Sequence, residues 1–136
     1  LVPETEWSKR YDEINAFEAE LAAAGTTILK CMLNVSFEEQ KNRLAERLDD
    51  PSKYWKYNPG DLDSRSKWPA YMEAYEAVLQ RCSTEVAPWH VIPSNRKWYR
   101  DWAVAELLRE KLAGLQLQWP EAEFDVAAEK ERVARA

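Results

Sequence analysis

The stretch of sequence that decides the fold is Thr26-Thr-Ile-Leu-Lys-Cys-Met-Leu-Asn-Val35. It has β-branched residues at both ends and is nearly continuous in apolar side chains. Such a run is typical of a strand that is covered on both faces, as the strands of parallel sheets are. We therefore expect a buried strand over residues 26–35.

The residues on either side of this strand predict helices. Before it, apolar residues recur at steps of three and four, and Gly25 supplies a left-handed stop. The recurring residues are Trp7, Tyr11, Ile14, Phe17 and Leu21. After the strand, Ser36-Phe-Glu-Glu39 is a capping box, in which Ser36 caps the helix and Glu39 reaches back to the Ser36 backbone. This second helix should run to about Leu48 and end before Pro51, because a proline disfavours helical geometry at the preceding residue.

Residues 53–68 mix cations, aromatic rings, a helix break and a new helix start. Asn58-Pro59 is such a start, with Asn as the cap and Pro at the first helical position. The pattern beyond it predicts a long helix with a kink or a restart at Pro69. Its apolar stripe comprises Trp68, Tyr71, Met72, Tyr75, Val78, Leu79 and Cys82.

A second strand and a last long helix complete the pattern. Residues 86–92 are typical of a short buried strand, and residues 93–95 turn the chain. The helix that follows carries Trp98 and Trp102 at helical spacing, which indicates that both belong to the core. Residues 121–136 are charged and weakly patterned, so we expect a frayed tail there.

Helices thus alternate with strands, which favours parallel pairing and right-handed crossovers. The predicted fold class is α/β, mostly helical with about two parallel strands. Two strands alone make a poor sheet. We expect an N-terminal part that this chain lacks, or a partner chain, to cover the open sheet.

Composition and charge limit the classes of function that the chain can have. With 136 residues, 46% hydrophobic and 32% charged, the chain suits one folded domain. A net charge of −5 argues against nucleic-acid binding over the whole surface, although residues 41–67 hold seven Lys/Arg against five Asp/Glu. There is no membrane-spanning apolar run and no secretory signal. We expect a cytoplasmic protein that binds no membrane, with Cys31 and Cys82 as reduced core thiols.

Several stretches, in the same order and at similar separations, resemble the C-terminal half of the polyphosphate kinase 2 family over about residues 2–120. They are Arg10-Tyr-Asp-Glu-Ile-Asn-Ala-Phe-Glu18, Gly25-Thr-Thr-Ile-Leu-Lys30, Ser36-Phe-Glu-Glu-Gln40, Asp49-Asp-Pro-Ser-Lys-Tyr-Trp-Lys56, Asp61-Leu62, Ala87-Pro-Trp89 and Arg96-Lys-Trp-Tyr-Arg100.

The resemblance implies a three-layer P-loop kinase-like fold, similar to thymidylate kinase, of which residues 1–120 would form part. It implies a lid over about residues 49–68 and an activity that moves phosphate between inorganic polyphosphate and adenine or guanine nucleotides, with Mg²⁺. In the family a Gly-rich loop and a metal-binding Asp lie upstream. This chain holds no G-x-x-x-x-G-K and three Gly in all. We therefore expect no catalytic or metal-ligating residue in this chain, and no activity from it alone.

Phosphoryl transfer depends on positioning and positive charge, so spaced cations on the lid suit a flexible polyanion. The candidate polyphosphate-binding residues are Arg43, Arg47, Lys53, Lys56 and Arg65. Each has a simpler interpretation. Arg43 and Arg47 share one helical stripe and either face solvent or pair with a neighbouring carboxylate, namely Glu39, Glu46 or Asp50. The lysines are surface residues in that interpretation, and Arg65 pairs with Asp61.

The resemblance also indicates a loop that borders the nucleotide, here Pro93, Ser94 and Asn95, with helix capping as the rival role for Ser94 and Asn95. Trp55 either anchors the lid to the body of the domain, which is favoured, or stacks on a base. The alternative to an enzyme part is a truncated, non-catalytic protein that binds polyphosphate or a partner. A homo-oligomer, or association with a missing N-terminal half, is expected in either case.

Overall fold

The computed structural model describes residue 3 and residues 7–136. The expected domain over residues 1–120 also includes residues 1, 2 and 4–6, which lie outside the described residues. The elements in order are α2 (Arg10–Ala23), β1 (Lys30–Asn34), α3 (Phe37–Asp49), the 3₁₀-helix η1 (Pro51–Lys56), α4 (Gly60–Arg65), α5 (Trp68–Arg81), β2 (Trp89–Pro93), α6 (Lys97–Gly114) and α7 (Val126–Ala134). Their contacts divide the chain into two units, Leu1–Glu106 and Leu107–Ala136.

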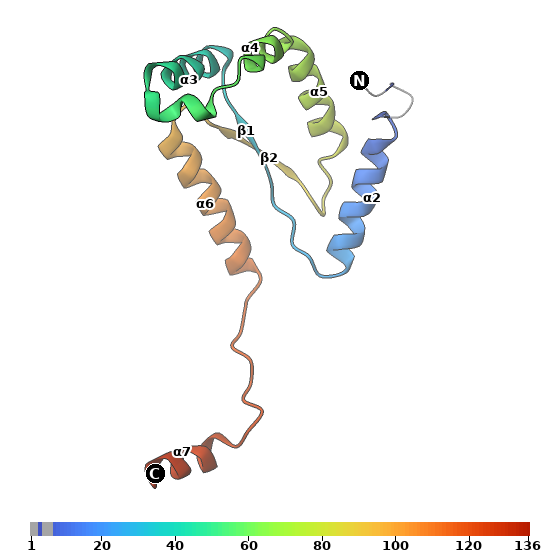
Figure 1. Ribbon diagram of the computed structural model, residues 1–136. Helices are drawn as coiled ribbons and strands as arrows, with labels where there is room; N and C mark the ends of the chain where they lie inside the picture. The colour runs from blue at the N-terminus through green and yellow to red at the C-terminus, as the bar shows by residue number, and fades with distance from the viewer. Residues whose placement is uncertain (1–2, 4–6) are drawn as a thin grey trace. The chain divides into compact units, whose positions relative to one another are not determined.

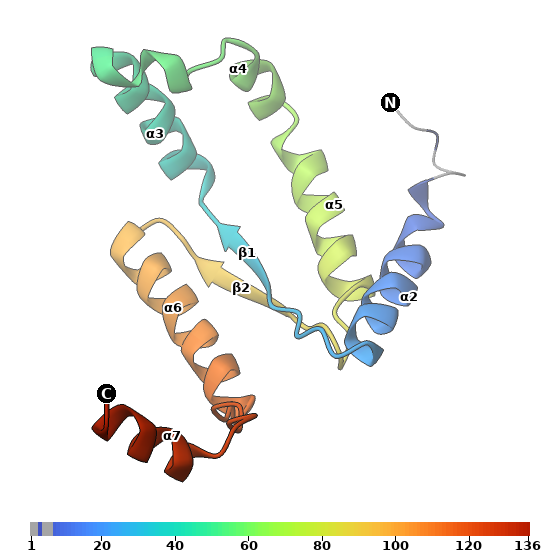
Figure 2. The same cartoon turned by 60° about the horizontal axis from the view of Figure 1, so that its bottom comes forward.

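The centre of the first unit is a parallel pair of strands. β1 and β2 pair in register from Lys30 opposite Trp89 to Asn34 opposite Pro93. One further bond, from the Ser94 amide to the Asn34 carbonyl at 2.8 Å, continues the pairing beyond the strands. Figures 1 and 2 show the strands between α5 on one side and the first part of α6 on the other. The predicted α/β class, mostly helical with two parallel strands, is confirmed.

The start of α3 confirms one half of the predicted capping box. The Ser36 hydroxyl accepts a hydrogen bond from the Glu39 amide at 3.2 Å, which satisfies a backbone donor that the helix leaves free. The other half is wrong. The Ser36 amide donates to Asn95 Oδ1 at 2.9 Å, and the Glu39 carboxylate instead binds Arg43. A residue distant in sequence therefore completes this helix end.

Local capping also explains why residues 50–69 form the starts of three separate helices, η1, α4 and α5. The Asp50 side chain accepts from the Ser52 amide at 3.0 Å and begins η1. The Asn58 side chain accepts from the Gly60 amide at 2.9 Å at the start of α4. A new helix, α5, then begins with Pro69 in its first turn. The start at Asn58-Pro59 and the restart at Pro69 are both confirmed.

Both strands are shorter and less covered than predicted. β1 has five residues and none of them is buried, so the expectation of a strand covered on both faces is wrong. The reason is that, in the part of the chain that the structure describes, β2 is the only strand beside it. β2 begins at Trp89 because the chain before it bends. Side chains hold this bend, with the Ala87 amide bonded to Thr84 Oγ1 and the Trp89 amide to Ser83 Oγ.

The apolar core is small. Its buried apolar side chains are Leu44, Cys82, Ala87 and Ile92. Trp98 and Trp102 are exposed, so their assignment to the core is wrong. Their helical spacing is that of a core-facing stripe, but no described residue buries that stripe. Both cysteines are free thiols, as expected, although only Cys82 is buried.

The second unit contains the end of α6 and a short terminal helix. The prediction of a frayed tail is wrong, because residues 126–134 form α7. The Asp125 side chain explains this helix, since its Oδ1 accepts from the amides of Ala127 and Ala128 at 2.9 and 3.0 Å. Among the described residues, no helix combines the length and the apolar character needed to cross a membrane.

Candidate functional site

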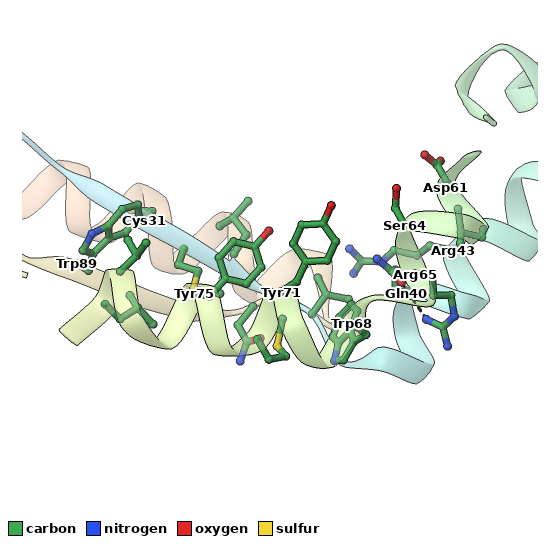
Figure 3. A pocket seen from close by; sticks show the side chains of 18 of the residues that line it. Cys31, Gln40, Arg43, Asp61, Ser64, Arg65, Trp68, Tyr71, Tyr75 and Trp89 are labelled. Atoms are coloured by element: carbon green, nitrogen blue, oxygen red, sulfur yellow. Dashed lines mark hydrogen bonds between the residues drawn. The ribbon is translucent and has the colours of Figure 1, made fainter. Parts of the chain in front are cut away.

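A groove of about 760 Å³ lies between β1, α3, α4 and α5. Polar and charged side chains gather at one end of it, where Figure 3 shows Gln40, Arg43, Asp61, Ser64 and Arg65. Aromatic side chains follow along α5 towards Trp89, as the same figure shows for Trp68, Tyr71 and Tyr75. The groove thus has a cationic end and an aromatic wall.

Arg43 lines the groove, but its guanidinium is held by the chain itself. Its Nε donates to Glu39 Oε1 at 2.9 Å, one helical turn away. Its Nη2 donates to the carbonyl oxygens of Ser94 at 2.6 Å and of Asn95 at 3.1 Å. The planar fork of arginine permits this set of bonds, which a lysine would not reproduce. Arg43 therefore ties α3 to the loop that follows β2.

The predicted nucleotide loop, residues 93–95, is fixed by its side chains as well. Ser94 is 1% exposed and its hydroxyl donates to the Ile92 carbonyl at 2.8 Å. Asn95 accepts from the Ser36 amide and donates to the Ser36 hydroxyl at 3.0 Å. A second hollow, of about 330 Å³, lies beside the loop. It is lined by Asn34, Ser36, Pro93, Ser94, Asn95, Arg96, Trp98 and Tyr99. This hollow lies where the carboxyl ends of both strands meet, the usual ligand edge of an open α/β sheet.

Arg47, also in the groove, has looser partners. Its Nη1 donates to the Lys56 carbonyl at 3.1 Å and lies 3.4 Å from Asp61 Oδ2. The two side chains of this ion pair are 36% and 41% exposed. Solvent therefore reaches both charges, and such a pair contributes little to stability.

Arg65 reaches across from α4 to the first turns of α3. Its Nη1 donates to the Phe37 carbonyl at 2.7 Å and to Gln40 Oε1 at 2.9 Å. Its guanidinium carbon lies 3.4 Å from the centre of the Phe37 ring. The alternative interpretation, in which Arg65 pairs with Asp61, is wrong, because Asp61 pairs with Arg47 instead. The acceptors of Arg65 are uncharged, so its positive charge is not neutralised by a bonded carboxylate.

Lys53 and Lys56 do not join the three arginines in the groove. Lys53 Nζ lies 2.9 Å from Asp50 Oδ2. This contact, with the bonds from Ser52, lowers the pKa of Asp50 from 3.8 to about 2, and the Asp50 hydrogen bond raises the pKa of Lys53. Lys56 Nζ lies 4.8 Å from the centre of the Trp55 ring. Trp55 is 79% exposed, so the described residues do not bury it, and its anchoring to the body of the domain stays a prediction.

The sequence profile of polyphosphate kinase 2 matches residues 1–119. The chain belongs to the polyphosphate kinase 2 family. A protein of Meiothermus ruber named AMP/ADP-polyphosphate phosphotransferase is 53% identical over 130 residues, which are 96% of this chain and 48% of that protein. The crystal structure of polyphosphate kinase 2 from Arthrobacter aurescens TC1 matches with a TM-score of 0.94 and 55% identity, over 98% of this chain and 48% of that one. A Leptolyngbya boryana protein, named as an uncharacterized protein in the chlN 3′ region, is 42% identical over 114 residues, 84% of each chain.

The family resemblance is thus confirmed. The chain spans about half the length of the Meiothermus and Arthrobacter relatives. Within the described residues no cluster of three or more His, Cys, Asp or Glu could hold a metal ion.

The structure adds lining residues that the sequence analysis missed. Tyr71 and Tyr75 form part of the groove wall, although the sequence pattern shows them only as members of the apolar stripe of α5. The presence of tyrosine, with a polar hydroxyl, at these stripe positions was the available signal. Arg96 and Tyr99 lie beside the loop at residues 93–95. Both belong to a stretch that carries the family resemblance, Arg96-Lys-Trp-Tyr-Arg100.

Proposed function

We propose that this chain is the C-terminal, cation-bearing part of a polyphosphate-dependent nucleotide phosphotransferase. The whole protein would move phosphate between polyphosphate and nucleoside mono- or diphosphates. The observation that carries the proposal is the groove in which Arg43, Arg47 and Arg65 line one end, in a chain of the polyphosphate kinase 2 family. The name of the Meiothermus relative, AMP/ADP-polyphosphate phosphotransferase, supports adenine nucleotides as one substrate class.

The chemistry of the ligand suits this arrangement. Polyphosphate is a flexible chain of anions, and arginine makes forked bonds to phosphate oxygens. Arg47 and Arg65 would bind the chain, with Arg43 behind them as the residue that orients the loop at residues 93–95. Lys53 and Lys56 lie on the proposed lid, residues 49–68, outside the groove. Closure of that lid over the phosphates would bring these lysines to the ligand and exclude water.

The catalytic centre is proposed to lie outside this chain, with Mg²⁺ supplying charge neutralisation there when it is bound. The chain alone is then inactive and requires the rest of a phosphotransferase domain. Among the described residues, one edge of β1 has no paired strand, and Trp98 and Trp102 are exposed. These features support association with such a half or with a second copy. The free thiols Cys31 and Cys82 agree with the reducing cytoplasm as its location.

Titration with polyphosphate tests the binding part of the proposal. Binding to this chain should weaken steeply as salt is raised, because each phosphate contact releases bound counterions. Arg65→Ala should weaken binding more than Lys41→Ala, a control that removes the same charge from a residue outside the groove. Equal effects of the two variants would contradict a specific role for the groove.

A chimera tests the catalytic part. This chain would replace the matching 48% of the Arthrobacter protein, which is 55% identical to it. We expect the chimera to phosphorylate AMP or ADP from polyphosphate in the presence of Mg²⁺, and this chain alone to show no turnover. A folded but inactive chimera beside an active parent would contradict the proposal, and turnover by the chain alone would contradict its dependence on a second half.

The second candidate is a non-catalytic protein that binds polyphosphate or a partner. The observation that favours it is the Leptolyngbya relative, of which this chain covers 84%. Salt-sensitive polyphosphate binding combined with an inactive chimera is the result that would select this candidate.

A further inference from the structure

The groove arginines differ in how firmly the chain holds them. Arg43 is bonded to a carboxylate and to two carbonyl oxygens, and Arg65 to uncharged acceptors and the face of a ring. Arg47 has one carbonyl partner and one carboxylate partner, Asp61, at 3.4 Å. This carboxylate lies on α4, whereas Arg47 lies on α3. The two residues therefore form a partly exposed ion pair between helices, at the cationic end of the groove.

Asp61 is placed so that it competes with an anionic ligand. Both members of the pair line the groove, and both are more than a third exposed. The carboxylate occupies one of the positions beside the guanidinium that a phosphate oxygen would take. Because it is tethered, it is present near Arg47 at a high effective concentration. The long, exposed contact is nevertheless weak enough for a polyanion to replace.

We propose that Asp61 determines the affinity of the groove for polyphosphate, as an internal counter-ion that the ligand displaces from Arg47. This inference rests on the proposed function, since it assumes that polyphosphate enters the groove. The bound phosphate takes the place of the Asp61 carboxylate, and the contact that Asp61 makes between α4 and α3 is broken. Asp61 thereby weakens binding, so that the binding of a chain of many phosphates stays reversible.

The chain offers a matched control for this proposal. Asp63 lies in the same helix, is exposed, and forms no ion pair within the described part of the chain. Asp61→Asn and Asp63→Asn therefore make the same change in net charge, but only Asp61→Asn removes the negative charge beside Arg47. Measured by titration of the 136-residue chain with long-chain polyphosphate, Asp61→Asn should bind about two- to five-fold more tightly than Asp63→Asn, as expected for loss of an exposed ion pair.

A double-mutant cycle assigns the effect to Arg47. In an Arg47→Ala background the two asparagine variants should bind polyphosphate equally, because no guanidinium is left to free. Asp61→Glu, which keeps a carboxylate at this position, should bind polyphosphate within two-fold of the wild type. If circular dichroism shows that Asp61→Asn changes the helix content, the comparison of Asp61→Glu with the wild type still tests the proposal.

Each outcome separates this inference from the function on which it rests. Salt-sensitive binding that is equal for Asp61→Asn and Asp63→Asn would overturn the role of Asp61 and leave polyphosphate binding intact. Weaker binding by Asp61→Asn would show that Asp61 positions Arg47 for the ligand, which also overturns it. Absence of polyphosphate binding by the wild type and every variant would overturn the proposed binding function together with this inference.

Discussion

Removal of the Arg43 side chain should destabilise the protein more than removal of any other groove arginine. In Arg43→Ala, the Ser94 carbonyl loses a charged donor at 2.6 Å, and Ser94 is 1% exposed. A buried acceptor left without its partner costs about 1–3 kcal/mol. The half-buried pair with Glu39 adds about 0.5 kcal/mol, as i,i+4 pairs do. Asn95 is exposed, so water replaces its bond to Arg43 at little cost. The expected loss in the free energy of unfolding is therefore about 1.5–3.5 kcal/mol.

The conservative variant sharpens this prediction. Arg43→Lys keeps the positive charge, but a single ammonium cannot reach Glu39 and both carbonyl oxygens in the geometry of the arginine fork. We expect it to recover less than half of the lost stability. Arg47→Ala is the control, since it removes an exposed pair and should cost less than about 1 kcal/mol.

Equilibrium unfolding in urea, followed by the fluorescence of the tryptophans, measures all three variants. Polyphosphate titration of the same samples gives a second reading. If Arg43 holds the loop, Arg43→Lys lowers stability while its affinity for polyphosphate changes little. The reasoning would be refuted by Arg43→Ala having a free energy of unfolding within 0.5 kcal/mol of that of Arg47→Ala, or by Arg43→Lys being as stable as the wild type.

Three other perturbations test the rest of the structure. Lys30→Met should lower the free energy of unfolding by about 3 kcal/mol in urea titrations, because it leaves Glu18, now 2.6 Å from the ammonium and 13% exposed, without its cation. Lys53 holds the pKa of Asp50 at about 2 in the folded chain, below the usual 3.8. The folded state thus binds fewer protons than the unfolded state between about pH 4 and 2. The contribution of Asp50 to stability is therefore present above about pH 4 and is lost as the pH falls towards 2. Urea midpoints measured across that range should show this loss in the wild type and not in Asp50→Asn. Burial raises the pKa of the Cys82 thiol, which is 2% exposed; mass spectrometry should therefore find it alkylated only after unfolding, and rapid labelling of the native chain would contradict its burial.

Local sequence determined most helix boundaries, and it could therefore predict them. Asn58-Pro59 and Pro69 mark real helix starts because each acts on backbone groups within a few residues. The same reasoning applies to Asp125, whose capping bonds were overlooked in a weakly patterned tail. Patterns longer than a turn were less reliable. The apolar run at residues 26–35 indicated burial that depends on neighbouring elements, and the described part of the chain supplies only β2 as a paired strand.

For the candidate site, the sequence could predict that Arg43 and Arg47 share one helix face, but not which groups they contact. Spacing places Arg43 and Arg47 on one stripe of α3, and the structure confirms that both line one groove. Their partners lie far along the chain, as with Ser94 for Arg43 and Asp61 for Arg47. Such contacts depend on how the elements pack, which residue spacing does not encode. The interpretation of Arg65 as a partner of Asp61 is wrong for this reason. Asp61 is close in sequence, but Arg65 instead donates to the distant Phe37 carbonyl.

The two ends of the strand pair are held by cations, and this arrangement explains why the groove arginines have unequal roles. At the start of β1, the Lys30 ammonium donates to Glu18 and to the Cys82 carbonyl, both at 2.6 Å. At the other end, Arg43 donates to the carbonyls that follow β2. With only a small buried core, these long-range polar contacts carry much of the order around the strands. A cation that performs this task is not free to follow a ligand. In the proposed function, phosphate binding would therefore fall to Arg47 and Arg65, and Arg43 would keep the loop at residues 93–95 in place.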